Sequence, residues 1–269
     1  IMKGKVTLGS LRVRQDFLIA SGLVAAYEKG EPVSEEMMEM ALQRIRQLGA
    51  HEVGHTLGLS HNYASTYEGR HSVMDYPHPL VKIKNKNELD LSDAYTNEIG
   101  AWDKVAITYG YQDFTEGVDE EEGLNEILQN SLEDGLMFIS DRDARAPSGA
   151  HAYAHLWDNG SNVEEELERV MKVREIALNN LSEKKVPFGQ PMATLEEVLV
   201  PMYMFHRYQA EATAKLIGGL EYTYALRGDG QTPLKVLDGD RQRAAIGALM
   251  TTITPEALAI PEKVLELIP

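Results

Sequence analysis

Apolar residues recur at helical spacing along most of the chain, and short turn-rich stretches separate the runs. Near the N-terminal end, the pattern predicts a short strand at residues 4–8 and a helix that Ser10 caps and that ends near residues 30–32. A second helix is predicted from Ser34 to about Leu57. The side chains expected to face inward are Leu11, Phe17, Leu18 and Leu23 in the first helix, and Met38, Leu42, Ile45 and Leu48 in the second.

A polar stretch with several prolines follows from His61 to about Asp90, and the rest of the chain is predicted to be mostly helical. The predicted helices cover residues 93–109, 120–132, 162–182, 193–217 and 239–251, with a short closing segment. Leu220–Leu226 reads as a strand before a turn at residues 228–230. We expect a predominantly α-helical α+β protein, with one region at residues 1–112 and a helical region at residues 113–269 that can pack with it as one unit.

Residues 51–61 fit the pattern H-E-x-x-H-x-x-G-x-x-H, which is a zinc signature. On a helix, His51 and His55 lie about one turn apart on one face, so both rings can reach one metal ion. Glu52 lies beside them and is the candidate general base that takes a proton from water. His61 can join the pair only if the helix ends, and Gly58 can adopt the positive φ that turns the chain back.

Three histidine ligands leave the fourth position of a tetrahedral zinc ion open, which is typical of a catalytic site. We therefore expect one catalytic zinc ion held by His51, His55 and His61. An alternative is a gluzincin-type site, because Asn97-Glu98 resembles the downstream Asn-Glu of gluzincins, whose third ligand is a glutamate. Since His61 already fills that place, Glu98 is expected to be a structural acid.

Two further groups of polar residues resemble metal ligands less closely. His151 and His155 are also four residues apart, but no glutamate follows the first and both lie in a loop bounded by glycine and proline. Asp141 and Asp143 could bind calcium as a second cofactor, but two carboxylates fall short of the roughly 6–8 oxygen ligands that calcium takes. An ordinary loop is favoured at both places.

Ser72-Val73-Met74-Asp75-Tyr76-Pro77 resembles the methionine turn of the metzincin proteases, the clan whose zinc signature residues 51–61 match. The resemblance implies that Met74 forms an apolar floor beneath the metal ligands. It also implies that Tyr76 lies near the metal and can stabilise an oxyanion, as in astacin-like and serralysin-like members. The alternative is that Tyr76 is an ordinary turn tyrosine packed beside Pro77.

Three other segments, "KGKVTLGSLRVRQDFL", "NEIGAWDKVAITYGY" and "HRYQAEATAKLIGG", are similar to bacterial zinc metalloproteases of the Met-zincin type. This resemblance runs over the whole chain. It implies the lower, methionine-turn half of a metzincin-like catalytic domain with an appended helical region, as the C-terminal part of a larger protein. Because the chain opens with Ile1, we expect a targeting sequence upstream and export to the periplasm, the cell surface or the medium.

Composition excludes several other classes. The net charge of −16 argues against nucleic acid as a partner, because phosphates would be repelled. No apolar run is long enough to span a membrane. The absence of cysteine rules out disulfides and thiol catalysis. With 43% hydrophobic residues, the chain can bury a sizeable core.

The expected function is therefore zinc-dependent hydrolysis of peptide bonds, with a protein or peptide as substrate. The rival hypothesis is a zinc-stabilised binding module without turnover. It arises because metzincins usually place a sheet before the zinc helix, and the edge strand of that sheet pairs with extended substrate. Only the strand predicted at residues 4–8 precedes His51, so the chain by itself is expected to be a poor protease.

Overall fold

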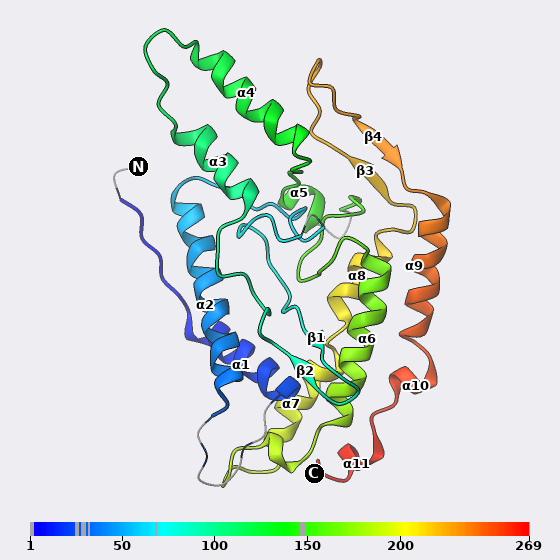
Figure 1. The fold of residues 1–269 in the computed structure, drawn as a ribbon. Helices are drawn as coiled ribbons and strands as arrows, with labels where there is room; N and C mark the ends of the chain where they lie inside the picture. Colours follow the sequence, from blue (N-terminus) through cyan, green and yellow to red (C-terminus); the bar gives the residue numbers. More distant parts are fainter. Residues whose placement is uncertain are drawn as a thin grey trace.

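Helices surround a long irregular segment that runs between α2 on one side and α6 with α8 on the other (Figure 1). The computed structural model describes residues 3–24, 27, 31, 33–67, 69–145 and 149–268. The longer helices are α1 (Ser10–Val24), α2 (Glu35–Thr56), α3 (Ala101–Tyr111), α4 (Glu120–Glu133), α6 (Val163–Asn179), α7 (Thr194–Tyr203), α8 (Arg207–Ala214) and α9 (Gly239–Thr251). The short ones are α5 (Asp141–Ala144), α10 (Pro255–Leu258), α11 (Glu262–Leu265) and a 3₁₀ turn at Glu183–Lys185.

Two antiparallel pairs of short strands are the sheets of the described residues. Strand β1 (Lys82–Ile83) pairs with β2 (Leu89–Asp90), and β3 (Leu220–Tyr222) pairs with β4 (Leu234–Val236). The prediction of a predominantly helical α+β fold is confirmed. The strand predicted at Leu220–Leu226 is present but shorter, and its partner at residues 234–236 was not predicted.

The N-terminal strand prediction is wrong, because residues 3–9 form no regular element. A strand needs a neighbour to bond its N–H and C=O groups, and no described strand lies beside this stretch. Helix α1 does begin at Ser10, and Leu23 is buried, but Leu11 is 79% exposed. Gly30 and Pro32, where the helix was expected to end, lie outside the described residues.

Helix α2 occupies almost the predicted range, with Ser34 at its N-cap position. Its predicted inward stripe is wrong, since Met38 is 47% exposed and Leu42 is 38% exposed. The helix is turned so that a mixed face is buried: Met37, Met40, Ala41, Gln43, Arg44, Gln47, His51 and Gly54. The polar members have partners there, as Gln43 Nε2 donates to the Ser92 carbonyl at 3.0 Å. This burial of satisfied polar groups orients His51 inward.

Helix α3 begins at Ala101 rather than near residue 93, because its N-terminus is anchored to the segment before Met74. The buried carboxylate of Asp103 accepts hydrogen bonds from the Gly100 N–H at 2.7 Å, the Val73 N–H at 2.8 Å and the Ser72 hydroxyl at 2.6 Å. A side chain at Gly100 would collide with the His71 carbonyl. Hydrogen bonds of this kind, between residues far apart in the sequence, leave no apolar periodicity from which the start of the helix could be predicted.

The helix predicted at residues 193–217 is divided into α7 and α8. Pro201 lies in the last turns of α7, where its ring weakens the helical hydrogen bonds. The carbonyl of Tyr203 accepts a hydrogen bond at 2.8 Å from the buried Arg174 of α6 instead. The predicted helices at 120–132, 162–182 and 239–251 are confirmed as α4, α6 and α9.

The main core joins α1 and α2 to α6 and α7. Its fully buried side chains include Met40 of α2, Val173 of α6, and Leu195 and Met202 of α7. The irregular segment between α2 and α3 crosses this frame, and the core thereby holds it in place (Figure 1). No described helix alone is long and apolar enough to cross a membrane, although α9 followed by Pro255–Leu265 meets both criteria as a pair bent by 55°.

Candidate metal centre

The C-terminal end of α2 carries the first two histidines of the zinc signature. His51 and His55 lie one turn apart, and the helix ends at Thr56. Gly58 has φ of +92°, a conformation that favours glycine, and the chain then turns back. The turn is closed by a hydrogen bond of 3.0 Å from the Leu59 N–H to the Gly54 carbonyl. His61 is thereby carried back toward the two helical histidines.

The rings of His51, His55 and His61 converge on one point. One ring nitrogen from each lies within 4.8 Å of the others, and the Nε2 atoms of His55 and His61 are 3.1 Å apart. Among the described residues, this is the one group of three or more histidines and acids whose ligand atoms meet in this way. Glu98 is exposed and does not belong to the group.

The other nitrogen of each ring is held by a hydrogen-bond acceptor. Nδ1 of His51 lies 2.7 Å from the Val73 carbonyl, and Nδ1 of His55 lies 2.9 Å from the Leu59 carbonyl. Nδ1 of His61 lies 2.8 Å from the carboxylate of Asp141. Carbonyls and carboxylates only accept, so each Nδ1 carries the proton and each Nε2 presents a lone pair. Converging lone pairs repel one another unless a cation lies between them, so the donor set fits a metal ion such as zinc.

Burial keeps His51, the first candidate ligand, neutral. His51 is 2% exposed, and its removal from water lowers its pKa to about 4, against the smaller opposing effect of the hydrogen bond to Val73. Positive charge on His55, His61 and Arg44 makes a smaller contribution to the same lowering of the pKa. A neutral imidazole is the form that binds a metal, and His51 is in that form at neutral pH.

The methionine turn lies directly against α2. The Val73 carbonyl accepts from Gln47 Nε2 at 3.1 Å as well as from His51, so two helix residues hold the turn. Met74 is 0% exposed, and its thioether packs on Gly54, where any larger side chain would collide with it. The glycine inside the His-Glu-x-Gly-His stretch therefore allows the close approach of the methionine, and this role of Gly54 was not foreseen.

Tyr76 extends from the same turn to the histidines. The centroid of its ring lies 4.8 Å from that of His61 and 5.5 Å from that of His51. The guanidinium carbon of Arg145 lies 5.5 Å from the centre of the Tyr76 ring. Glu52 is partly exposed beside His51, and none of the hydrogen bonds found in the described part of the chain engages its carboxylate.

Asp141 belongs to the site, although the sequence suggested only a loop acid or a calcium ligand. Its other oxygen accepts from Arg145 at 3.1 Å and from the Tyr63 hydroxyl at 3.4 Å. Burial would raise the pKa of Asp141, but the hydrogen bonds from His61 and Arg145 outweigh it and hold the pKa below its usual value. Asp141 lies 80 residues after His61, so no local spacing could have linked them.

The remaining sequence candidates have other partners. Asp143 accepts from the hydroxyls of Tyr222 at 2.7 Å and Tyr224 at 2.6 Å. His151 lies between the Tyr222 carbonyl, 2.8 Å from Nε2, and the Tyr153 N–H, which donates to Nδ1 at 3.2 Å. Asp143 thereby links α5, and His151 the segment after α5, to β3 and the residues that follow it.

Comparison with known proteins identifies the family. The profile described as Met-zincin matches residues 33–268, a stretch that includes the three histidines, Met74 and Asp141. No curated protein and no solved structure matches the chain. Because the profile covers most of the sequence and the histidine triad is in place, the chain belongs to the Met-zincin family.

Proposed function

We propose that this chain is a zinc-dependent endopeptidase, with zinc held by His51, His55 and His61. The observation that carries the proposal is the convergence of three Nε2 lone pairs, each fixed by an acceptor on Nδ1. Three histidines leave one position of a tetrahedral ion open, as in catalytic rather than structural zinc sites. Membership of the Met-zincin family supports the same reading.

The proposed chemistry assigns a role to each side chain around the histidines. A zinc ion in this site would polarise the peptide carbonyl and lower the pKa of a water molecule to about 7. The carboxylate of Glu52 takes a proton from that water and later passes it to the nitrogen of the leaving amine. The Tyr76 hydroxyl donates a hydrogen bond to the oxygen that gains negative charge as the carbonyl is attacked.

Asp141 has a positioning role in this proposal. Its carboxylate holds the Nδ1 proton of His61 and so directs Nε2 toward the ion. Arg145, held by the same carboxylate, brings a positive charge to within 5.5 Å of the centre of the Tyr76 ring. The helical C-terminal part of the chain thus completes a site whose ligands all come from the first part.

Replacement of Glu52 by Gln tests the mechanism. The amide keeps the shape of the side chain but cannot take a proton, so zinc content should be unchanged while cleavage of a peptide library falls by about 10²–10⁴-fold. Cleavage within about tenfold of the parent chain would contradict the role of Glu52. Cleavage by neither protein, with one zinc bound to each, is the result expected both of a binding module without turnover and of a chain that lacks the sheet that aligns the substrate.

A gluzincin-type site is the second candidate and is distinguished by metal content. Zinc should be lost from a His61→Ala variant and retained by Glu98→Ala, because Glu98 is exposed and lies outside the histidine group. The reverse result would assign the third ligand to Glu98.

A further inference from the structure

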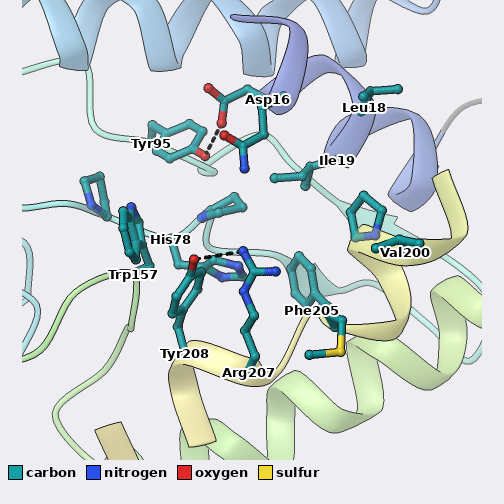
Figure 2. Close-up of a pocket in the computed structure, with 15 residues that line it drawn as sticks. Asp16, Leu18, Ile19, His78, Tyr95, Trp157, Val200, Phe205, Arg207 and Tyr208 are labelled. Carbon is teal, nitrogen blue, oxygen red and sulfur yellow. Dashed lines mark hydrogen bonds between the residues drawn. The ribbon is translucent and has the colours of Figure 1, made fainter. Parts of the chain in front are cut away.

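A cavity of about 390 Å³ is lined by residues of α1, of the segment that follows Tyr76, and of α7 and α8. Figure 2 shows Arg207 and Tyr208 at one end of it and Asp16 and Ile19 of α1 at the other. Pro77, the residue after Tyr76, also lines it. Cavities of several hundred cubic ångströms with mostly apolar walls are typical of ligand sites.

The cavity is joined to the metal centre through aromatic rings. Trp157 lines it and stacks on Tyr76, with ring centroids 5.8 Å apart, and the backbone N–H of Trp157 donates to the backbone carbonyl of Tyr76 at 2.7 Å. On its other side, Trp157 lies 4.5 Å from the ring of Tyr208. A ligand in the cavity would therefore contact Trp157, which is hydrogen-bonded through its backbone to Tyr76, the candidate for stabilising the oxyanion.

The backbone of Trp157 is strained. Its φ of +57° lies in the left-handed region, which a bulky aromatic residue rarely adopts. Such strain costs free energy and persists where the surrounding structure holds it, often at binding sites. Here the conformation places the indole between Tyr76 and the cavity.

Arg207 brings to the cavity a positive charge that none of the ion pairs of the described residues neutralises. Arg207 stacks over Tyr208 at 4.3 Å from the ring centre and donates to its hydroxyl at 2.8 Å. None of the ion pairs found among the described residues includes Arg207, in a chain whose net charge is −16. Asp16 does not supply the missing anion, because it is buried, accepts from the Tyr95 hydroxyl at 3.0 Å and lies 3.8 Å from Arg44 Nε.

We propose that this cavity binds a residue of a peptide that has a free main-chain carboxylate and an aromatic or aliphatic side chain. Arg207 would bind the carboxylate, and Trp157 would form the wall against which the side chain packs. A guanidinium binds a carboxylate through two parallel hydrogen bonds. A single arginine suits one negative charge better than the two of a phosphate monoester. The identification of the ligand as part of a peptide rests on the proposed function.

The fluorescence of Trp157 can be used to measure ligand binding in the cavity. The chain has two tryptophans, so a Trp102→Phe variant leaves Trp157 as the single indole. The probes are N-acetylphenylalanine and its amide, and a short peptide that ends in phenylalanine with a free or amidated C-terminus. Tryptophan fluorescence reports binding in the variant, and calorimetry reports it in the unmodified chain, so the test does not depend on the variant folding.

The free carboxylate should improve the affinity of both probes by roughly tenfold or more. Arg207→Gln should abolish this preference, and Arg207→Lys should retain part of it. Arg243→Gln is the matched control, because Arg243 pairs with Asp240 on the surface of α9 and should leave the preference unchanged. A preference of the peptide but not of the single amino acid would identify a peptide C-terminus as the source of the carboxylate.

Equal affinity for the acid and the amide, or an Arg207→Gln variant that keeps the preference, would overturn the proposal. Absence of binding by all probes would overturn it too. The measurements are made on zinc-free and zinc-loaded protein. Failure here with normal Glu52-dependent cleavage would leave the proposed function standing, whereas carboxylate binding with cleavage that does not depend on Glu52 would support the cavity and contradict the proposed mechanism.

Discussion

His51 and His55 have the same spacing as His151 and His155, but the two pairs lie in different backbone structures. The first pair is on α2, which places both rings on one face. In the second pair, His151 lies in an isolated β-bridge and His155 in irregular backbone, where the same spacing brings no common face. Both nitrogens of His151 are engaged by the backbone, whereas each ring of the first pair has one nitrogen held and the other directed at its neighbours.

The difference between the pairs lies in how the ring nitrogens are engaged: in each candidate ligand one nitrogen is held by an acceptor and the other is directed at the neighbouring rings. Val73, Leu59 and Asp141 each supply an acceptor, and each comes from a different segment. His155 has no such acceptor: it is buried, and its nearest acid is Glu211, 3.4 Å away and largely exposed. Its neutral ring is a core residue rather than a ligand.

The largest expected contrast is between His61→Ala and His155→Ala. Loss of a ligand should weaken zinc binding by more than about 100-fold, since loss of a residue that only supports a ligand already costs about 10–100-fold. The His155 variant should bind zinc like the parent, because His155 lies outside the histidine group. Competition with a chromogenic chelator measures both affinities. Equal losses in the two variants would mean that the second pair also contributes to the metal site.

A smaller loss of zinc affinity is expected when Asp141, which accepts a hydrogen bond from His61, is replaced. Asp141→Ala should weaken zinc binding by about 10–100-fold, and Asp141→Asn by less, because the uncharged amide oxygen still accepts a hydrogen bond from the Nδ1–H of His61. Asp143→Ala is the control from the same helix, since Asp143 bonds to Tyr222 and Tyr224. The d–d spectrum of the cobalt-substituted protein should change for Asp141 variants alone. An unchanged affinity in Asp141→Ala would remove its positioning role.

The smallest effect concerns the stability of the zinc-free protein in acid. Burial lowers the pKa of His155 to about 4, below its unfolded value of 6.5, so the unfolded state binds more protons between these values. Its contribution to stability is complete above pH 6.5 and is lost as the pH falls toward 4.

A His155→Leu variant should therefore lose less stability on acidification. Between pH 7.5 and 5.5, its free energy of unfolding should fall by about 1.4 kcal/mol less than that of the parent. Urea denaturation at the two pH values measures this difference, and comparing the two pH values removes the effect of the substitution on packing. Equal pH dependence in both proteins would mean that His155 is protonated in the folded state.

Local features of the sequence determined the candidate ligands and the helix that carries two of them. The spacing of His51 and His55 needs only helical geometry, and Gly58 needs only its freedom to adopt positive φ. Several other helices were predicted correctly because local features also specify them. In α4 and α6, the caps Asp119 and Asn162 precede the apolar pattern and bond to the first turn.

Tertiary structure decided which groups support those ligands and which way α2 faces. The pairing of Asp141 with His61 spans 80 residues, and that of Gln47 with Val73 spans 26, so neither leaves a periodic signal. The predicted stripe through Met38 and Leu42 failed because Arg44 and Gln47, polar by sequence, have buried partners that exist only in the folded chain. Apolar spacing reports which faces can be buried, whereas the balance of long-range polar contacts settles which one is.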